Sequence, residues 1–362
     1  MPRPQLALGL FLVLASACKD EPAADPAPTS TEETKTDDAK TGDAKTGEPG
    51  PDDIEATDGK SGLAGLTKDL VDQARRTTSE TTRLVPASAE YLVRMRVAEL
   101  LAYGPATELW RKAEDTEEEF RTAVDVMVAC MARLEVFEEL TVGFDSDEHK
   151  VLIAHAVGLG KDDTWRCFQE KTVARGKTWD MQITGTPRGE GPQLLTDDGN
   201  RGYLPDDDTL VLVSKEWDAE VSALLAGEGT PAVEGPLAGP VARVPADSPL
   251  WLAGRVGAKA SAGLEGSPFA GMTDISFSLR IEDEQVSVST SIDAGEAADA
   301  TRMKDELTTQ FAQFEGMLPM FGFPSTVGPK IVFETEGDLV SLDFTLTKSE
   351  IDGIRGGIER TF

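Results

Sequence analysis

The 362-residue chain has 65 Asp and Glu against 35 Lys and Arg, which gives a formal net charge of −30. A chain of this length suits about two domains. So acidic a chain repels phosphate backbones, which argues against a nucleic-acid-binding protein. Only two His and three Cys are present, so the composition excludes zinc fingers, iron–sulfur clusters and multi-histidine metal sites. We therefore expect no cofactor and no metal centre.

The first 17 residues have the pattern of a secretory signal peptide. Arg3 precedes an apolar stretch over residues 6–14, and the small residues Ala15-Ser16-Ala17 follow it. The apolar stretch is too short to span a bilayer. The sequence therefore predicts export and removal of residues 1–17.

Ala15-Ser16-Ala17-Cys18 resembles the lipobox of bacterial lipoproteins, in which the cysteine becomes the lipidated first residue. The family pattern prefers Leu three positions before the cysteine, where this chain has Ala15. The resemblance implies a lipid anchor on Cys18. With Lys19 rather than Asp in the next position, it also implies sorting to the outer membrane of the cell envelope. An ordinary signal peptide followed by a coincidental cysteine is the alternative.

Residues 18–60 differ sharply in composition from the rest of the chain. Ile54 is the only large apolar residue between Lys19 and Lys60, and the pentapeptide DAKTG occurs twice in tandem. Such a segment buries too little apolar surface to offset its ordering entropy, so we expect a disordered acidic tether. Four apolar residues then follow at the spacing of a short amphipathic helix, which would pack on the body or bind a partner: Leu63, Leu66, Leu70 and Ala74.

The body contains one sequence motif twice. VPASAEYLVRMRV (85–97) and VPADSPLWLAGRV (244–256) align without a gap and are identical at five of 13 positions. After each copy come a strand hairpin, a helix, further strands and a short helix. The same order in both halves indicates one structural unit used twice.

The predicted elements can be placed along the chain. In the first half we expect a helix over residues 105–136, a hairpin over 140–157 and a second helix over 163–173. Two strands, over 179–184 and 209–214, and a helix over 216–225 should follow. In the second half we expect a hairpin over residues 275–292 and a helix over 296–314. Two strands, over 330–335 and 339–347, and a helix over 350–360 should follow. Strands with one apolar face are typical of antiparallel sheets. The sequence thus predicts an α+β fold of two similar tandem modules, residues 61–235 and 240–362, with helices packed on one face and a linker at residues 235–240.

Cys130 and Cys167 lie on two predicted helices of the first module. Both helices should cover the same face of its sheet, so the side chains are able to meet. In an oxidising envelope the two cysteines are a candidate disulfide. Two buried thiols that do not touch are the alternative.

The most apolar candidate for an exposed surface is a segment near the end of the chain. We call it the Phe/Met segment and define it by Phe314, Met317, Met320, Phe321 and Phe323. Packing at the end of a helix is one interpretation. A binding lip for a hydrophobic ligand or partner is the other, because Met and Phe adapt to varied surfaces.

The two histidines indicate no catalytic site. His149 lies in a predicted hairpin turn with Asp145, Asp147 and Glu148, a group that resembles a cation site but lacks the glycine and distal glutamate of an EF-hand loop. His155 lies on a predicted strand, and neither histidine has a serine or cysteine partner at a recognisable spacing. A solvated turn and a structural histidine are the preferred interpretations.

The leading hypothesis is a non-enzymatic, lipid-anchored envelope protein. Its anchor would hold it to the membrane, and its tandem modules would bind another envelope component, either a protein or a glycan. A periplasmic carrier or chaperone for a hydrophobic ligand is the second hypothesis, supported by the Phe/Met segment. A hydrolase that uses a pair of carboxylates is the third.

Overall fold

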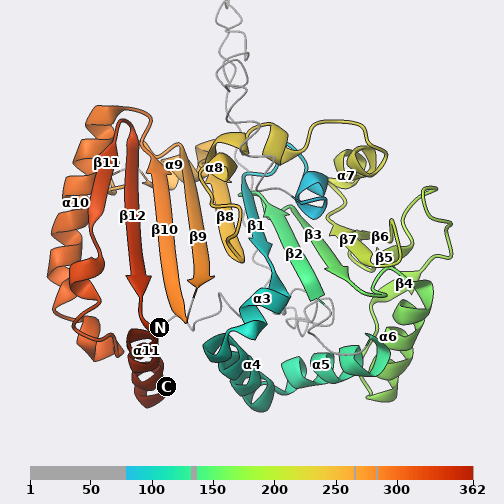
Figure 1. Ribbon diagram of the computed structural model, residues 1–362. Coiled ribbons are helices and arrows are strands. Elements are labelled where there is room, and N and C mark those ends of the chain that lie inside the picture. The colour runs from blue at the N-terminus through green and yellow to red at the C-terminus, as the bar shows by residue number, and fades with distance from the viewer. Residues whose placement is uncertain (1–78, 132–136, 265, 283, 362) are drawn as a thin grey trace, which may run out of the picture.

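Figure 1 shows the computed structural model, which describes residues 79–131, 137–264, 266–282 and 284–361. The predicted signal peptide, Cys18, the acidic tether and the amphipathic stretch at 63–74 lie outside the described residues. The described chain has the expected α+β fold, in which helices pack on a large antiparallel sheet.

Within the described residues, twelve strands form one continuous sheet. From one edge to the other its strands are β11 (Phe333–Glu336), β12 (Leu339–Leu346), β10 (Gln285–Asp293), β9 (Asp274–Glu282), β8 (Leu250–Arg255), β1 (Tyr91–Met95), β2 (Phe137–Phe144), β3 (Lys150–Ala156), β7 (Thr209–Val213), β6 (Arg201–Tyr203), β5 (Leu194–Thr196) and β4 (Met181–Ile183). The two repeats therefore share one sheet, and the second repeat occupies the half that ends at β11.

The two copies of the repeated motif pair with each other at the centre of the sheet. β1 and β8 run antiparallel, and their register places Val93 opposite Leu252, which are equivalent positions of the repeat. Tyr91 lies opposite Gly254, and the residues equivalent to them in the repeat, Leu250 and Met95, also lie opposite each other. Equivalent strands that pair about equivalent residues are related by a two-fold axis. This pseudo-two-fold axis passes through the Val93–Leu252 pair, perpendicular to the sheet.

The hairpins that flank the central strands are built alike. β2 and β3 form one hairpin, and β9 and β10 form the other. Glu148 in the first turn has φ 68° and Glu284 in the second has φ 66°, and these are the two non-glycine residues with positive φ in the described part of the chain. Each turn thus has a left-handed glutamate shortly before its second strand, although residues 145–149 form the first loop and residues 283–284 the second.

Helices cover both faces of the sheet in the first half. One face carries α3 (Val97–Ala102), α4 (Gly104–Thr116), α5 (Glu118–Met131) and α6 (Asp162–Ala174), and the other carries η2 (Thr81–Leu84), α7 (Asp218–Leu225), η4 (Ala232–Glu234) and α8 (Ala238–Ala242). We expected helices on one face only. β3 shows the reason for the difference, because Val151 and Ile153 enter one core while Leu152 and Ala154 enter the other. A continuous apolar run of this kind marks a strand that is buried on both faces.

The second half has a smaller core. α10 (Ala297–Glu315) packs on β11 and β12, where Ala300 and Met303 meet Ile292 and Val340. α9 (Ala258–Leu264) follows β8, as α3 follows β1. The chain then passes through η5 (Leu318–Phe321) and η6 (Gly328–Lys330) and ends in α11 (Lys348–Thr361).

Two predicted segments differ from the structure. Residues 235–240 are not a linker, because Leu237 and Ala238 are fully buried and α8 packs on β8 and β9. The helix predicted over residues 105–136 is two helices, α4 and α5, which separate at Glu117 and are joined by an edge-to-face contact of Trp110 and Phe120. Five acids crowd residues 114–119, and like charges three or four positions apart disfavour one continuous helix.

Candidate functional site

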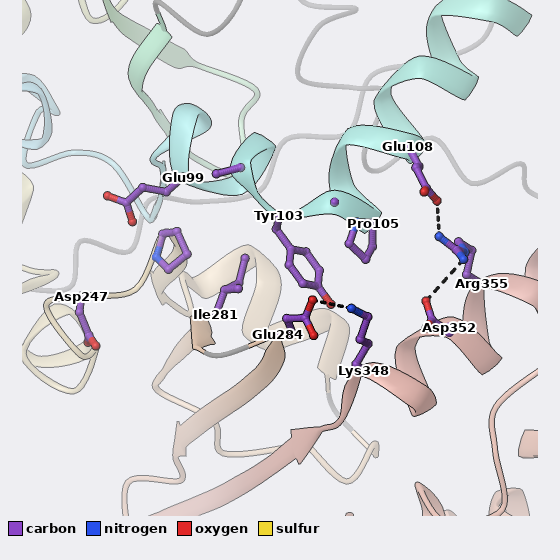
Figure 2. Close-up of a pocket in the computed structure, with 13 residues that line it drawn as sticks. Glu99, Tyr103, Pro105, Glu108, Asp247, Ile281, Glu284, Lys348, Asp352 and Arg355 are labelled. Carbon is purple, nitrogen blue, oxygen red and sulfur yellow. Dashed lines mark hydrogen bonds and ion pairs between the residues drawn. The ribbon is translucent and has the colours of Figure 1, made fainter.

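A groove of about 730 Å³ lies where the two repeats meet at one end of the sheet. Figure 2 shows its walls: α3 and α4 of the first repeat face the tip of the β9–β10 hairpin and α11 of the second. Two cations, Lys348 and Arg355, line it together with five carboxylates, Glu99, Glu108, Asp247, Glu284 and Asp352. The site is mixed in charge. Two further cations pair with its carboxylates, since Arg96 lies 2.6 Å from Glu99 and Arg280 lies 4.0 Å from Asp247.

Ion pairs hold the charged side chains in place across the groove (Figure 2). Lys348 Nζ donates a hydrogen bond to Glu284 at the hairpin tip, and this bond raises the pKa of Lys348 above its usual range. Arg355 of α11 donates to Glu108 of α4 and lies 3.4 Å from Asp352 Oδ1. The Glu108–Arg355 pair joins the two repeats directly.

Tyr103 presents the one buried polar atom of the groove for which no hydrogen-bond partner exists among the described residues. Its hydroxyl oxygen is inaccessible to solvent and unpaired. Burial raises the pKa of Tyr103, and the charges of Asp352 and Glu284 raise it further. The hydroxyl therefore keeps its proton at neutral pH. An unmade hydrogen bond of this kind costs about 1–3 kcal/mol.

The pseudo-two-fold axis relates this end of the sheet to a second junction at the opposite end. There α9 and the β2–β3 hairpin, the counterparts of α3 and the β9–β10 hairpin, contact each other. Lys259 of α9 donates its ammonium to the carbonyl oxygen of Ser146 at 2.7 Å and lies 3.1 Å from Asp147 Oδ1. The Ser146 N–H donates to Glu90 Oε2 at 3.0 Å. The β2–β3 hairpin tip is thereby tied to α9 and to the residue before β1. We call this contact the closed junction.

The repeated motif differs between the two junctions at residues that bond in the closed junction. The alignment of the two copies places Pro249 opposite Glu90, and its ungapped continuation places Leu100 opposite Lys259. Proline and leucine carry neither the carboxylate nor the ammonium that ties the closed junction together. The contacts of Lys259 and Glu90 are thus absent from the groove, where Lys348 of α11 instead gives its ammonium to Glu284 of the hairpin.

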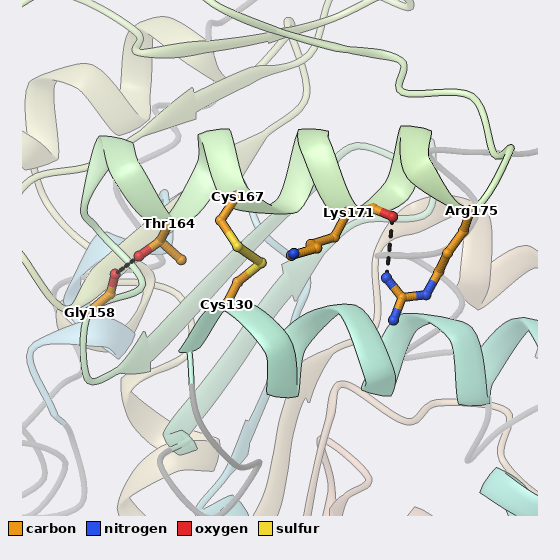
Figure 3. Close-up of a disulfide and its surroundings, with 6 residues drawn as sticks. All are labelled: Cys130, Gly158, Thr164, Cys167, Lys171 and Arg175. Carbon is orange, nitrogen blue, oxygen red and sulfur yellow. Dashed lines mark hydrogen bonds between the residues drawn. A yellow bond between two sulfur atoms is a disulfide. The ribbon is translucent and has the colours of Figure 1, made fainter.

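The structure joins the two cysteines that were a candidate disulfide. Figure 3 shows Cys130 of α5 bonded to Cys167 of α6, with an S–S distance of 2.05 Å. The bond ties together two helices that cover the same face of the first half. It lies away from the groove and holds the fold rather than the site.

The Phe/Met segment is exposed in part and lies outside the groove. Phe314 is 54% exposed and Met320 is 76% exposed, and Met317 is also exposed. These are three of the seven large apolar residues that are exposed in the described part of the chain, and they lie at or just after the C-terminal end of α10. Phe323 is half-buried, and the side chain of Phe321 is not among those described.

Both histidines have local structural partners. His149 Nδ1 lies 2.7 Å from Asp145 Oδ2 within its hairpin turn, and His155 Nδ1 lies 3.1 Å from Thr209 Oγ1 on the neighbouring strand. The described residues contain no group of three or more His, Cys, Asp or Glu that is arranged to hold a metal ion. No helix within the same residues has the length and apolar character needed to cross a bilayer.

The groove itself was not predicted from the sequence. Its lining comes from segments spread between residues 99 and 355, none of which forms a recognisable motif. One signal was present, since the exchange of Glu90 for Pro249 removes a charge within an otherwise similar repeat. That exchange has a meaning only once the pairing of β1 with β8 is known.

No family model and no curated protein matches this chain. Solved structures of TP0453 in three crystal forms have a similar fold. Form III has a TM-score of 0.46 at 11% identity over 77% of this chain and 98% of that one. Form IV has a TM-score of 0.41 at 10% identity over 79% and 98%, and form I has 0.41 at 12% over 78% and 99%. Similarity this distant carries no functional argument, so function is argued below from the site alone.

Proposed function

We propose that this chain is a lipid-anchored, non-enzymatic protein of the bacterial cell envelope that binds another envelope component in the groove between its repeats. In this proposal a lipid on Cys18 holds the protein to the outer membrane, and the acidic tether separates the folded body from the lipid surface. The bound component is a protein or a glycan.

The difference between the two junctions carries the proposal. Counterpart hairpins and helices meet at the two ends of the sheet. Lys259 and Glu90 bond across one junction, while the other is a groove of about 730 Å³. That volume lies within the range of ligand sites, which usually combine a preformed shape with a few fixed polar groups. The ion pairs of Lys348 and Arg355 are such groups.

Site-specific photo-crosslinking in the native envelope tests this function. A photoreactive amino acid replaces Ala102, which is exposed and lines the groove, and the matched control replaces Ala258, which is exposed at the start of α9 by the closed junction. We expect one partner in near-stoichiometric yield from position 102 and little from position 258. Equal capture at both positions, or no capture at 102, would contradict the proposal. A Cys18→Ala copy should leave the membrane fraction, and its retention there would contradict the lipid anchor.

One observation favours the carrier as a second candidate. On the face of the sheet away from α8, the register places Leu252 beside Phe277, and Val288 beside Leu279 and Phe344. All five side chains are only half-buried. A carrier would purify with a bound lipid or other apolar molecule, which organic extraction and mass spectrometry of the full-length protein would detect at about one molecule per chain.

A further inference from the structure

We propose that residues 63–74 of this chain form a helix that docks its apolar stripe on one face of the sheet in the second repeat. The stripe consists of Leu63, Leu66, Leu70 and Ala74. The inference goes beyond the proposed function, because it concerns the sheet next to the groove and not the partner in the groove. Three observations support it: an apolar face outside every described core, two helices that only the first repeat has, and the place where the described chain begins.

The sheet of the second repeat has one polar and one apolar face. On the side that α8 covers, Ser276 and Ser278 of β9 lie beside serines of β10. Six apolar residues lie together on the other side, and we call them the open face: Leu252, Phe277, Leu279, Val288, Leu342 and Phe344. All six are half-buried, and they belong to none of the three hydrophobic cores found among the described residues. Polar and apolar residues alternate in this way when one face of a sheet packs on a core, so we expect the open face to have a covering element.

The first repeat shows what covers the equivalent face. Its α4 and α5 lie between β1 and β2 in the sequence, and Trp110, Phe120 and Val124 of these helices pack in the core on that face. In the second repeat residues 256–273 join β8 to β9, and the described part of this connection contains one helix, α9, the counterpart of α3. Helices equivalent to α4 and α5 are therefore missing from the described part of the second repeat. A helix from elsewhere in the chain would supply the cover.

The described chain begins within reach of the open face. Ser79 lines a second cavity, of about 590 Å³, together with Glu99. Glu99 also lines the groove, and so does Ile281, which follows Leu279 of the open face on the same side of β9. β9 lies two strands from β1, which is about 10 Å across the sheet. Ala74 lies five positions before Ser79, and five extended residues span about 17 Å, so the segment is able to reach the open face past the end of β1.

The segment also fits the open face in size and polarity. A helix over residues 63–74 is about 18 Å long. The open face extends over β8, β9, β10 and β12, whose outer two strands lie about 14 Å apart. Lys68 and Asp72 lie on the side of such a helix opposite the stripe, so docking buries the leucines and leaves these charges in water.

Site-specific photo-crosslinking of the purified full-length protein tests the inference. Photoreactive benzoyl-phenylalanine replaces Leu66 on the stripe, and the matched control replaces Asp72 on the opposite side of the helix. Mass spectrometry of tryptic peptides then identifies the crosslinked residues. We expect crosslinks within one chain from position 66 to peptides that contain β9, β10 or β12, and none from position 72. Equal crosslinking from the two positions, or none from position 66, would overturn the proposal.

Matched charge variants identify the face on which the segment docks. Val288→Lys and Ser289→Lys place the same charge on opposite faces of β10. With the photoreactive residue at position 66, we expect Val288→Lys to remove most of the crosslink and Ser289→Lys to leave it unchanged. Equal effects of these two substitutions would overturn the inference.

A second pair of variants changes the segment and leaves the sheet intact, so it tests the contact even where Val288→Lys fails to fold. Leu70→Lys places a charge on the stripe, and Val71→Lys places it about a quarter turn away. Leu70→Lys should remove most of the crosslink from position 66, and Val71→Lys should leave most of it. A crosslink that survives Leu70→Lys unchanged would contradict docking through the stripe.

Other occupants of the open face would give different results. A second copy of this chain would give crosslinks between chains, which migrate as a dimer on a denaturing gel. An apolar ligand would purify with the protein and leave position 66 without a crosslink to the sheet. Either result would overturn the inference.

Discussion

Loss of the disulfide between Cys130 and Cys167 should lower the free energy of unfolding by about 4 kcal/mol. The bond joins residues 37 positions apart, and closing a loop of that length removes a large part of the entropy of the unfolded chain. The folded state should survive the loss, because Trp165 and Phe168 still anchor α6 in the core of the first half. The effect therefore arises mostly in the unfolded state.

Urea unfolding of the double variant Cys130→Ala/Cys167→Ala, followed by far-UV circular dichroism, measures this difference. Wild-type protein in a reducing agent is the control and should lose the same stability, while the reducing agent should not affect the double variant. A loss smaller than about 1 kcal/mol, or a wild type insensitive to reduction, would refute the reasoning.

Three further predictions concern single side chains. Gly254→Ala should cost about 1–3 kcal/mol in urea unfolding, because its Cβ would lie 2.5 Å from a ring carbon of Tyr91, and an unchanged midpoint would contradict this. Glu350→Gln should cost about 2 kcal/mol at pH 7. Burial opposes ionisation of Glu350, but hydrogen bonds from Lys330, Thr326 and Thr347 lower its pKa to about 2. The larger free energy of unfolding of the wild type should therefore fade as the pH drops below 4.5 and be absent near pH 2. Burial raises the pKa of Asp274 to about 6 against the effect of Arg243, so the folded state holds a proton that the unfolded state releases above pH 3.8. Wild-type stability should therefore gain a contribution from this group as the pH falls from 6 to 3.8, and Asp274→Asn should remove that gain, whereas an identical pH profile of the variant would contradict it.

The elements that were predicted correctly have a local signal. Alternating apolar residues in residues 275–292 predicted the hairpin of β9 and β10, and the helical spacing over residues 296–314 predicted α10, Ala297–Glu315. Both patterns depend on which face of one element is apolar, and the neighbouring sequence is enough to show that. The repeat was visible for the same reason, since its two copies are similar residue by residue.

The elements that were predicted wrongly depend on distant parts of the chain. Leu237 stands among glycines and prolines, which locally favour a linker, yet it is fully buried in one of the hydrophobic cores. The apolar run from Val151 to Ala154 is compatible with one or two covered faces, and only the position of β3 inside the sheet decides between them. The groove is the extreme case, because its walls come from both repeats and no local pattern contains it.

The pseudo-two-fold axis explains how one junction is free to differ from the other. The axis passes through the Val93–Leu252 pair, so the two junctions lie at opposite ends of the same sheet and share no side chains. The buried positions nearest the axis, Leu92 and Trp251, remain large and fully covered in both repeats. An exchange such as Glu90 for Pro249 therefore alters the surface of one junction without altering the central strand pairing. Duplication thus gives a scaffold in which the two junctions carry different side chains around the same central strand pair.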